Sequence, residues 1–356
     1  MAPRFAYAVL PAVLLAAALP LAAPALATPE VSVAASTGEI VDVTPTTSTL
    51  NAKKRHTEFF AASFEAEAGE TRFVGTELVI LDAKGTSPSE IFLGVTLLCK
   101  SPSGTTTSAE AGRNVWPAGA SFTIPIAFTM ITDVPGTYKC QADVMMCDPG
   151  QCASPTGTGK VRIVTQKMDP KSYSLLYVSR ALPAWAQSSR VPASGKDQVV
   201  KPGSSYSIKQ SFDLSDASGA IRVGAILSLT NCIEPSYPTS CKAAGTTKVN
   251  GSATVKLAAT VTQVANTPGA PCTTAKATSD TGAWSDKITW QQHHAVRGIW
   301  TPDFELSTDP GCSDTVQLVV TVSVGKGNAV VIEPGSRVKT TSIAYAIPGD
   351  TIPTYV

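Results

Sequence analysis

The chain has 356 residues, and only 15% of them are charged, with 28 Lys and Arg against 27 Asp and Glu. Without residues 1–27, which contain Arg4 and no acid, the balance is 27 against 27 (28 − 1). This balance excludes the basic excess with which proteins hold nucleic acid or an anionic membrane. The abundance of Thr, Ser, Ala, Val, Gly and Pro favours strands and turns over helical bundles.

Residues 1–27 have the features of a secretory signal peptide. Arg4 precedes an almost wholly apolar run over 6–19, and Ala25-Leu26-Ala27 places small residues at a cleavage site after Ala27. The alternative is a membrane anchor, but the run is shorter than a span of about 20 residues and Pro11 interrupts it. We therefore expect a secreted protein, extracellular or at the cell surface, with no membrane insertion.

Residues 28–50 are expected to be a flexible lead-in with one strand over 39–43, followed by a β-domain over 51–185. Apolar or alternating runs predict strands in this domain, and Pro125 places one of them at a sheet edge. Residues 58–66 suit a strand or a helix, and 101–114 suit a long polar loop. Helical periodicity over ten or more residues is absent from the sequence, so the fold is predicted to be all-β. The predicted strands are 73–81, 91–99, 121–131, 137–146, 160–166 and 174–179.

A second β-domain over 206–356, reached through a Pro-, Gly- and Ser-rich linker over 186–205, repeats the first. Ser63-Phe64-Glu65 matches Ser211-Phe212-Asp213, and Arg72-Phe73-Val74-Gly75 matches Ile221-Arg222-Val223-Gly224. The ends also match, with 176–183 similar to 342–348. The offset is 149 at the glycines (224 − 75) but 173 at the first cysteines (272 − 99). The second domain therefore contains an insertion of roughly two dozen residues.

The eight cysteines predict disulfide bonds, because an even number in an exported protein is typical of a disulfide framework. The repeat selects one pairing, in which a shared pair of each domain joins two packed sheets and two local pairs tie loops. Metal binding by Cys147-x4-Cys152 is the alternative, which we disfavour because zinc sites use tighter spacing. We expect no metal and no cofactor. The shared pairs are Cys99–Cys140 and Cys272–Cys312, and the local pairs are Cys147–Cys152 and Cys232–Cys241.

One motif resembles a known family. Cys99, Trp116 and then Asp133-x-x-Gly136-x-Tyr138-x-Cys140 resemble the pattern of immunoglobulin-like domains, and Trp290 follows Cys272 at a similar distance. The resemblance implies that the Tyr138 hydroxyl caps a corner beside Cys140. It also implies two tandem immunoglobulin-like antiparallel β-sandwich domains, stapled by disulfides, whose binding loops or sheet faces are exposed.

The strongest candidate binding region is 284–304, which holds three of the five tryptophans and two of the three histidines. Its indoles could stack on a sugar or peptide, and its arginine could fix a polar group. The alternative is that the tryptophans lie in the core. Adjacent histidines point to opposite faces of a strand, so they should not chelate a metal together. The candidate binding residues are Trp290, His293, His294, Arg297 and Trp300.

No catalytic motif is present in the sequence, neither a nucleophile elbow nor a His-Glu-x-x-His pattern. We therefore expect a noncatalytic binding or adhesion protein whose partner is an extracellular protein or glycan and not nucleic acid. The first alternative is a structural envelope protein that self-associates through edge strands. The second is a secreted hydrolase that uses His293 or His294.

Overall fold

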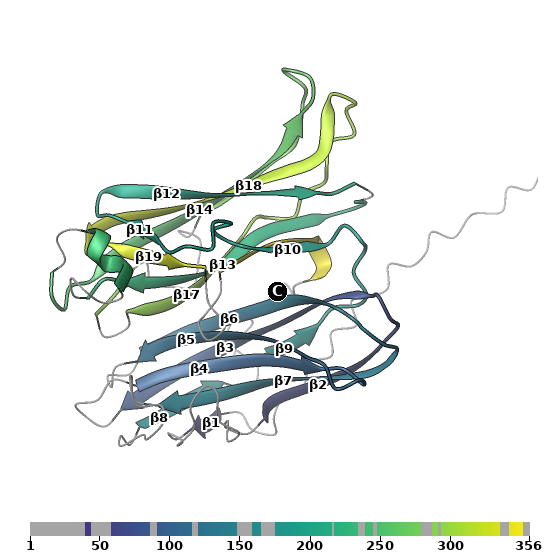
Figure 1. Ribbon diagram of the computed structural model, residues 1–356. Coiled ribbons are helices and arrows are strands. Elements are labelled where there is room, and N and C mark those ends of the chain that lie inside the picture. The colour runs from purple at the N-terminus through teal and green to yellow at the C-terminus, as the bar shows by residue number, and fades with distance from the viewer. Residues whose placement is uncertain are drawn as a thin grey trace, which may run out of the picture.

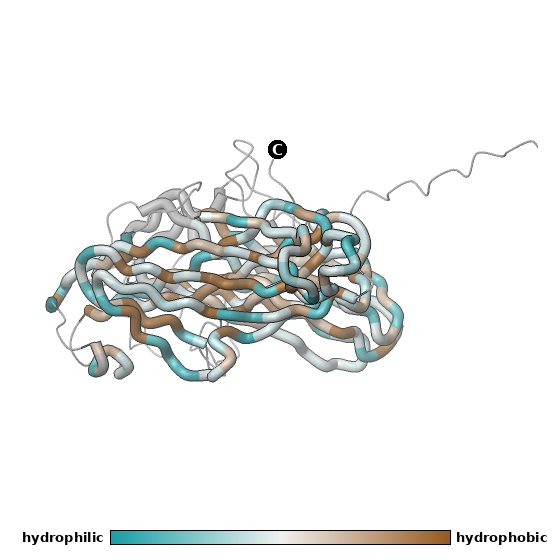
Figure 2. Tube along the Cα trace, turned by 90° about the horizontal axis from the view of Figure 1, so that it is seen from above, coloured by the Kyte–Doolittle hydropathy of each residue, from teal (hydrophilic) through white to brown (hydrophobic). Residues whose placement is uncertain are grey.

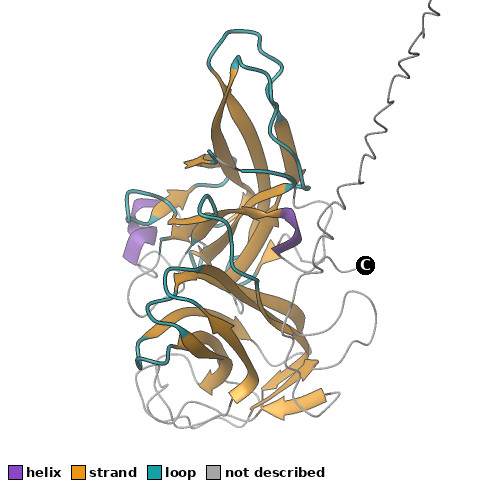
Figure 3. Cartoon of the chain, turned by 90° about the vertical axis from the view of Figure 1, so that its right-hand side faces the viewer, coloured by secondary structure: helices purple, strands orange, loops and turns teal. Residues whose placement is uncertain are grey.

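A computed structural model describes residues 40–43, 58–85, 91–115, 120–147, 159–164, 175–215, 217–233, 239–244, 248–278, 287–290, 293–334 and 342–351. The regular structure of these residues is nearly all β, as the composition predicted (Figure 3). The exceptions are short 3-10 helices at Thr239–Ala244 and Gly349–Thr351. In the described residues the strands form four antiparallel sheets.

The N-terminal half supplies sheets A and B. Sheet A has the order β1 (Ile40–Val43), β8 (Gly159–Val164), β3 (Thr71–Gly85) and β6 (Ala120–Ile131), and β9 (Leu175–Val178) also pairs with β3. Sheet B has the order β2 (Glu58–Ala66), β7 (Gly136–Cys147), β4 (Ile91–Lys100) and β5 (Thr106–Val115). The ambiguous segment 58–66 is thus a strand, and β6 lies at a sheet edge as Pro125 predicted.

The expectation of a long loop over 101–114 was wrong, because most of that segment is β5. This strand lies at the edge of sheet B and pairs only with β4. Its inward positions near the core hold only small alanines, Ala109 and Ala111, between polar outward residues. The alternation that marks a strand was therefore weak, and the real turn is confined to residues 101–105.

The C-terminal half supplies sheets C and D. Sheet C has the order β10 (Gln187–Arg190), β20 (Ile343–Pro348), β13 (Ile221–Asn231), β19 (Val330–Glu333) and β11 (Gln198–Val200), and β17 (His294–Trp300) also pairs with β13. Sheet D has the order β12 (Ser204–Asp213), β18 (Cys312–Gly327), β14 (Ala253–Ala265) and β15 (Thr274–Thr278), and β16 (Lys287–Ile288) also pairs with β14. The segment 186–205, expected as a linker, instead contributes β10 and β11 to sheet C, because their backbones pair with β20 and β19.

The two halves repeat one order of strands. In sheet B the order β2-β7-β4-β5 corresponds to β12-β18-β14-β15 in sheet D, and β1-β8-β3 corresponds to β11-β19-β13. The equivalence extends to single residues, since Gly75 lies opposite Tyr177 and Gly224 lies opposite Tyr345. Residues 232–252 separate β13 from β14, whereas only 86–90 separate β3 from β4. The additional residues of the second half thus lie between these two strands.

In Figure 1 sheet D lies uppermost, sheet C lies beneath it, and sheets A and B of the N-terminal half lie below sheet C. Sheet C is covered on both faces, since every residue of β13 except Arg222 is buried. One hydrophobic cluster runs through both halves and includes residues of all four sheets. The halves are therefore joined where β6 of sheet A and the edge strand β5 of sheet B meet sheet C, and sheet D has an outer face that points away from sheet C.

Three of the predicted disulfides are confirmed, and they lie within sheets or loops. Cys99 of β4 is directly opposite Cys140 of β7 in sheet B, with 4.0 Å between their Cα atoms. Cys272 and Cys312 tie the β14–β15 loop to the start of β18, and the third bond is Cys232–Cys241. Cys147 ends β7, but Cys152 lies outside the described residues, so the predicted pair Cys147–Cys152 stays a prediction.

The expectation that the shared pairs join two packed sheets was wrong. Neighbouring antiparallel strands already hold opposite Cα atoms about 4.5–5.5 Å apart, within reach of a disulfide, whereas packed sheets are about 10 Å apart. The bond between Cys99 and Cys140 spans the shorter of these separations. Because it lies within one sheet, it differs from the inter-sheet disulfide that the resemblance implied, and immunoglobulin-like repeats remain a prediction.

The Tyr138 hydroxyl caps the turn before β7, as the resemblance implied. It accepts hydrogen bonds from the backbone N–H groups of Asp133 at 2.9 Å and Val134 at 3.2 Å. It donates to Asp133 Oδ1 at 2.6 Å. Hydrogen bonds from Ser103, and then from Tyr138, hold the pKa of the Asp133 carboxyl well below its usual range. The turn is thus fixed by a charged side chain at the surface and a buried ring behind it.

Candidate functional site

The described residues of the predicted binding region 284–304 lie in several different surroundings rather than at one site. Trp284 lies outside the described residues, and Trp290 lies partly buried in the turn before β17. Phe304 forms a backbone bridge with Ile221 and packs against the core. The structure thus places the predicted residues on or beside one strand but directs their side chains to different places.

Trp300 lies in an aromatic junction between the two halves, formed by Phe73, Tyr177, Trp300 and Tyr345. The Trp300 ring stacks on Tyr345 with centroids 5.5 Å apart and meets Phe73 edge-on at 6.5 Å. Phe73 also meets Tyr345 edge-on at 5.3 Å and stacks on Tyr177 at 5.9 Å. Sheets A and C each supply two of these rings, so Trp300 holds the halves together.

Two glycines make room for the aromatic junction. A Cβ atom on Gly75 would lie 2.3 Å from the ring of Tyr177. One on Gly224 would lie 2.3 Å from the carbonyl oxygen of Ile299 and 2.6 Å from the Trp300 ring. Any larger residue would push these rings or the neighbouring strand away. The matched glycines of the repeat therefore have a packing role in both halves.

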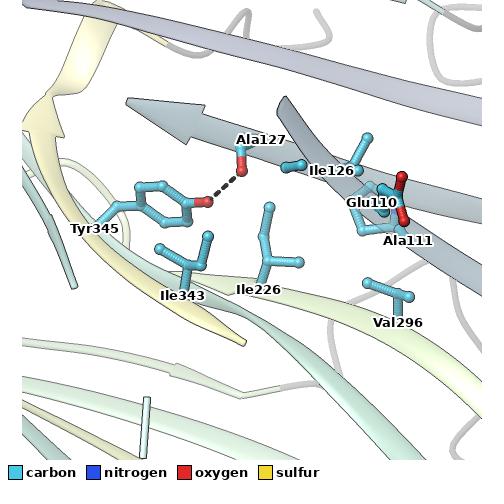
Figure 4. A pocket seen from close by; sticks show the side chains of 10 residues that line it. Glu110, Ala111, Ile126, Ala127, Ile226, Val296, Ile343 and Tyr345 are labelled. Atoms are coloured by element: carbon cyan, nitrogen blue, oxygen red, sulfur yellow. Dashed lines mark hydrogen bonds between the residues drawn. The ribbon is translucent and has the colours of Figure 1, made fainter. Parts of the chain in front are cut away.

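The junction leaves almost no free space between the two halves. The Tyr345 hydroxyl donates a hydrogen bond of 2.7 Å to the carbonyl oxygen of Ala127, across the boundary between sheets C and A (Figure 4). The cavity beside it, lined among others by Ile226, Val296 and Ile343, has a volume of about 10 Å³, which is no more than one water needs. Burial raises the pKa of Tyr345 and Tyr177 well above the usual tyrosine value. This cavity cannot hold a ligand.

Arg297 lies in the interior rather than at a surface. It alternates with Val296 and Gly298 along β17 and is only 3% exposed. Its Nη1 donates to the carbonyl oxygen of Val296 at 3.0 Å, and burial lowers its pKa to about 10. A ligand in solvent cannot reach this guanidinium without opening the sandwich.

His293 and His294 lie side by side at the start of β17. His293 is buried with Nδ1 3.2 Å from the carbonyl oxygen of Trp290, and His294 Nδ1 lies 2.7 Å from Thr230 Oγ1. Their ring centroids are 4.4 Å apart, so the prediction of opposite directions was wrong. The reason is that His293 precedes the strand and escapes its alternation. Among the described residues no group of three or more His, Cys, Asp and Glu side chains could hold a metal ion.

A surface that sequence analysis missed is the outer face of sheet D. Because Ile208, Leu257 and Val320 turn inward, their alternating neighbours face away from sheet C. Strand pairing sets these outward residues in rows across four strands. The rows are Ser207, Thr321, Ala258 and Thr278; Lys209, Val319, Thr260 and Lys276; and Ser211, Gln317, Thr262 and Thr274.

The outer face of sheet D is rich in hydroxyl groups and positively charged. Lys209, Lys256, Lys276 and Lys287 are all exposed, and no acidic residue stands in the three rows; Asp213, opposite Thr315, follows at the end of β12. None of the outward residues in the three rows is aromatic. Figure 2, which views the molecule from the sheet D side, shows polar and intermediate positions alternating with apolar ones along the strands.

The sequence contains a signal for this face, but one that needs the register of the sheet. Ser205, Ser207, Lys209 and Ser211 alternate along β12, and Thr274, Lys276 and Thr278 alternate along β15. Either run alone is an ordinary solvated strand face. Only the pairing of β12, β18, β14 and β15 shows that the runs lie side by side.

No protein-family model and no curated protein matches the chain. No helix in the described part of the chain is long and apolar enough to cross a membrane. Among solved structures, the N-terminal CBM22-1-CBM22-2 tandem domain of Paenibacillus barcinonensis Xyn10C is 10% identical, with 92% of this chain and 98% of that chain covered and a TM-score of 0.23.

The STIV MCP is 11% identical, with 87% of this chain and 97% of that chain covered and a TM-score of 0.21. A chain of the T=1 Penaeus vannamei nodavirus is 10% identical, with 90% of this chain and 96% of that chain covered and a TM-score of 0.15. Likenesses this weak do not bear on function.

Proposed function

We propose that the protein is a noncatalytic, exported binding protein that holds a glycan on the outer face of sheet D. The observation behind this proposal is the set of rows of exposed and half-buried Ser, Thr and Lys side chains across β12, β18, β14 and β15. The disulfides are compatible with export, because such bonds persist in oxidising compartments.

The spacing of the outer face suits a polymer. Rows of side chains recur at about 7 Å along the strands, and neighbours within a row are about 4.8 Å apart. A hydrogen bond to a neutral group contributes only about 0.5–1.5 kcal/mol net, because it replaces a bond to water. A chain molecule that meets many such side chains together can still bind, since linked contacts add their effects.

The titratable groups with shifted pKa values support a noncatalytic role. Asp133 and Tyr138 fix a turn, while Tyr177, Tyr345 and Arg297 owe their shifts mainly to burial. None of these five groups lies in an open pocket beside a nucleophile. A hydrolase built on His293 would need a path to a side chain that is 3% exposed.

Self-association through the edges of sheet D is the less favoured function. Its edge strands β12 and β15 each have an exposed lysine at or near the centre, Lys209 and Lys276. Lysines at such positions oppose pairing with the edge of another copy. The same face is open to a ligand that approaches from above the sheet.

A glycan array probed with the mature protein and two variants tests this function. Thr262→Trp places a bulky ring on the outer face of sheet D, and Ser63→Trp places one on the outer face of sheet B as a matched control. Both sites are exposed, so both variants should fold. We expect binding that Thr262→Trp abolishes and Ser63→Trp preserves. Equal binding by the two variants, or chemical turnover of a bound glycan, would refute the proposal.

A further inference from the structure

We infer that the glycan held by the outer face of sheet D is an acidic polysaccharide, bound through Lys209, Lys256 and Lys276. This inference rests on the proposed function and adds the chemical class of the ligand. It follows from the positions of the lysines, from the groups that surround them and from the shape of the face.

The three lysines are spaced for a polymer rather than for a small ion. Lys209 and Lys276 stand at the two ends of one row, three strand spacings apart, or about 14 Å at ~4.8 Å per strand. Lys256 lies four residues along β14 from Thr260 of that row, or about 13 Å at ~3.3 Å per residue. One sulfate or phosphate cannot bridge such a triangle, whereas a chain with repeated anionic groups can.

The chemistry of the face favours a charged ligand over a neutral one. Neutral sugars and other small ligands are usually held against apolar and aromatic side chains, and the rows offer only Val319 and Ala258 of that kind. Hydrogen bonds to charged groups contribute about 1.5–3 kcal/mol each, roughly twice the contribution of neutral ones. Anionic groups on the lysines would thus add the affinity that the hydroxyls alone lack.

Protection of sheet edges does not account for all the lysines. Lys209 and Lys276 lie on edge strands, where lysine commonly blocks aggregation. Lys256 instead lies on β14, opposite Ser323 of β18, away from either of those edges. Protection of the edge strands β12 and β15 therefore does not account for Lys256, whose position suits a third contact to the ligand.

Nucleic acid fits the face less well than a polysaccharide. Binding of single strands relies on aromatic side chains on which bases stack, and none stands in the rows. Duplex binding relies on a denser set of cations than three lysines about 14 Å apart. The many hydroxyls between the lysines suit the hydroxyl groups of a sugar chain.

The test compares dextran sulfate with dextran, which share a backbone and differ in charge, using the full mature protein. Polygalacturonate reports whether carboxylates serve as well as sulfates, and a DNA duplex provides the competing polyanion. The face variant combines Lys209→Gln, Lys256→Gln and Lys276→Gln. The matched control combines Lys100→Gln and Lys139→Gln, two exposed lysines that pair on the outer face of sheet B.

We expect the protein to bind dextran sulfate and not dextran, with a slope of log K against log[salt] of about −2 to −3 for three neutralised anionic groups. That slope predicts a loss of about 16- to 64-fold in affinity between roughly 50 and 200 mM salt. The face variant should lose this binding and its salt dependence, whereas the control variant should keep both.

Several outcomes would overturn the inference, and they differ from failure of the proposed function. Equal binding of dextran and dextran sulfate, lost in the face variant, would make the ligand a neutral glycan while the proposed function stands. Tighter binding of the DNA duplex would assign the lysines to nucleic acid. Equal loss in the face and control variants would refute the location of the site. Absence of binding to all four probes would refute the acidic class, and the glycan array would then judge the function separately.

Discussion

Removal of the Tyr345 hydroxyl tests whether the two halves are coupled through the aromatic junction. The side chain is fully buried, and its hydroxyl donates to the carbonyl oxygen of Ala127 at 2.7 Å. Tyr345→Phe keeps the ring against Phe73 and Trp300 and removes only this bond between sheets C and A. The variant therefore isolates one polar contact across the boundary between the halves.

The expected loss in the free energy of unfolding is about 1–2 kcal/mol, since a buried carbonyl loses its partner and ring packing is unchanged. For a cooperative unit of about 150–250 residues, this loss corresponds to a decrease of roughly 2–8 °C in Tm. Thermal and urea unfolding, followed by near- and far-ultraviolet circular dichroism, measure it. Tyr206→Phe, at a partly exposed tyrosine on β12, is the control and should change stability by less than about 0.5 kcal/mol.

The same variant should alter the response to alkali. Burial raises the pKa of Tyr345 above the value of about 10 that it has in the unfolded chain. Above that pH the unfolded state loses the phenolic proton while the folded state keeps it, so this stability is present below pH 10 and is lost as pH rises. The loss is about 1.4 kcal/mol per pH unit for each such tyrosine.

Tyr177 has a raised pKa as well, so it should still cause a loss of stability in alkali in the Tyr345→Phe variant. The variant should therefore lose stability less steeply above pH 10 than the parent protein. An unchanged alkaline slope, or a Tm equal to that of Tyr206→Phe, would refute the account of the junction. Two separate unfolding transitions in the parent protein would refute the coupling of the halves.

Two further predictions concern a glycine and the turn before β7. Gly224→Ala should lower the free energy of unfolding by about 1–3 kcal/mol, because its Cβ would meet the backbone of Ile299. Gly298→Ala, whose Cβ would lie 3.5 Å from the nearest atom, should lower it by less than about 1 kcal/mol. Similar Tm values for the two variants would contradict this packing. Asp133→Asn should destabilise the protein at neutral pH, and the difference should shrink as pH falls below about 4, since the lowered pKa of this carboxyl stabilises the fold only above its unfolded value. A difference that stays constant down to pH 2 in urea titrations would argue against it.

The sequence alone determined the β character of the chain and much of its local chemistry. Alternating and β-branched runs predicted most strands of sheets A and B, because a strand with one buried face repeats every two residues, but they missed β5 and left β2 open between strand and helix. Cysteine spacing and the repeat predicted three observed disulfides. The capped turn at Tyr138 was also predictable, since its interactions lie within six residues of chain.

Only the tertiary structure decided what each strand face meets. Strand alternation shows that Trp300 and Arg297 face opposite ways. It does not show that Trp300 meets Phe73 of the N-terminal half, or that Arg297 is buried inside the C-terminal half. In the same way, Lys209 and Lys276 are 67 residues apart (276 − 209) and share a row only through the register of four strands. Which surfaces are buried and which charges become neighbours are set by pairing and packing between distant segments, and local sequence patterns do not encode these.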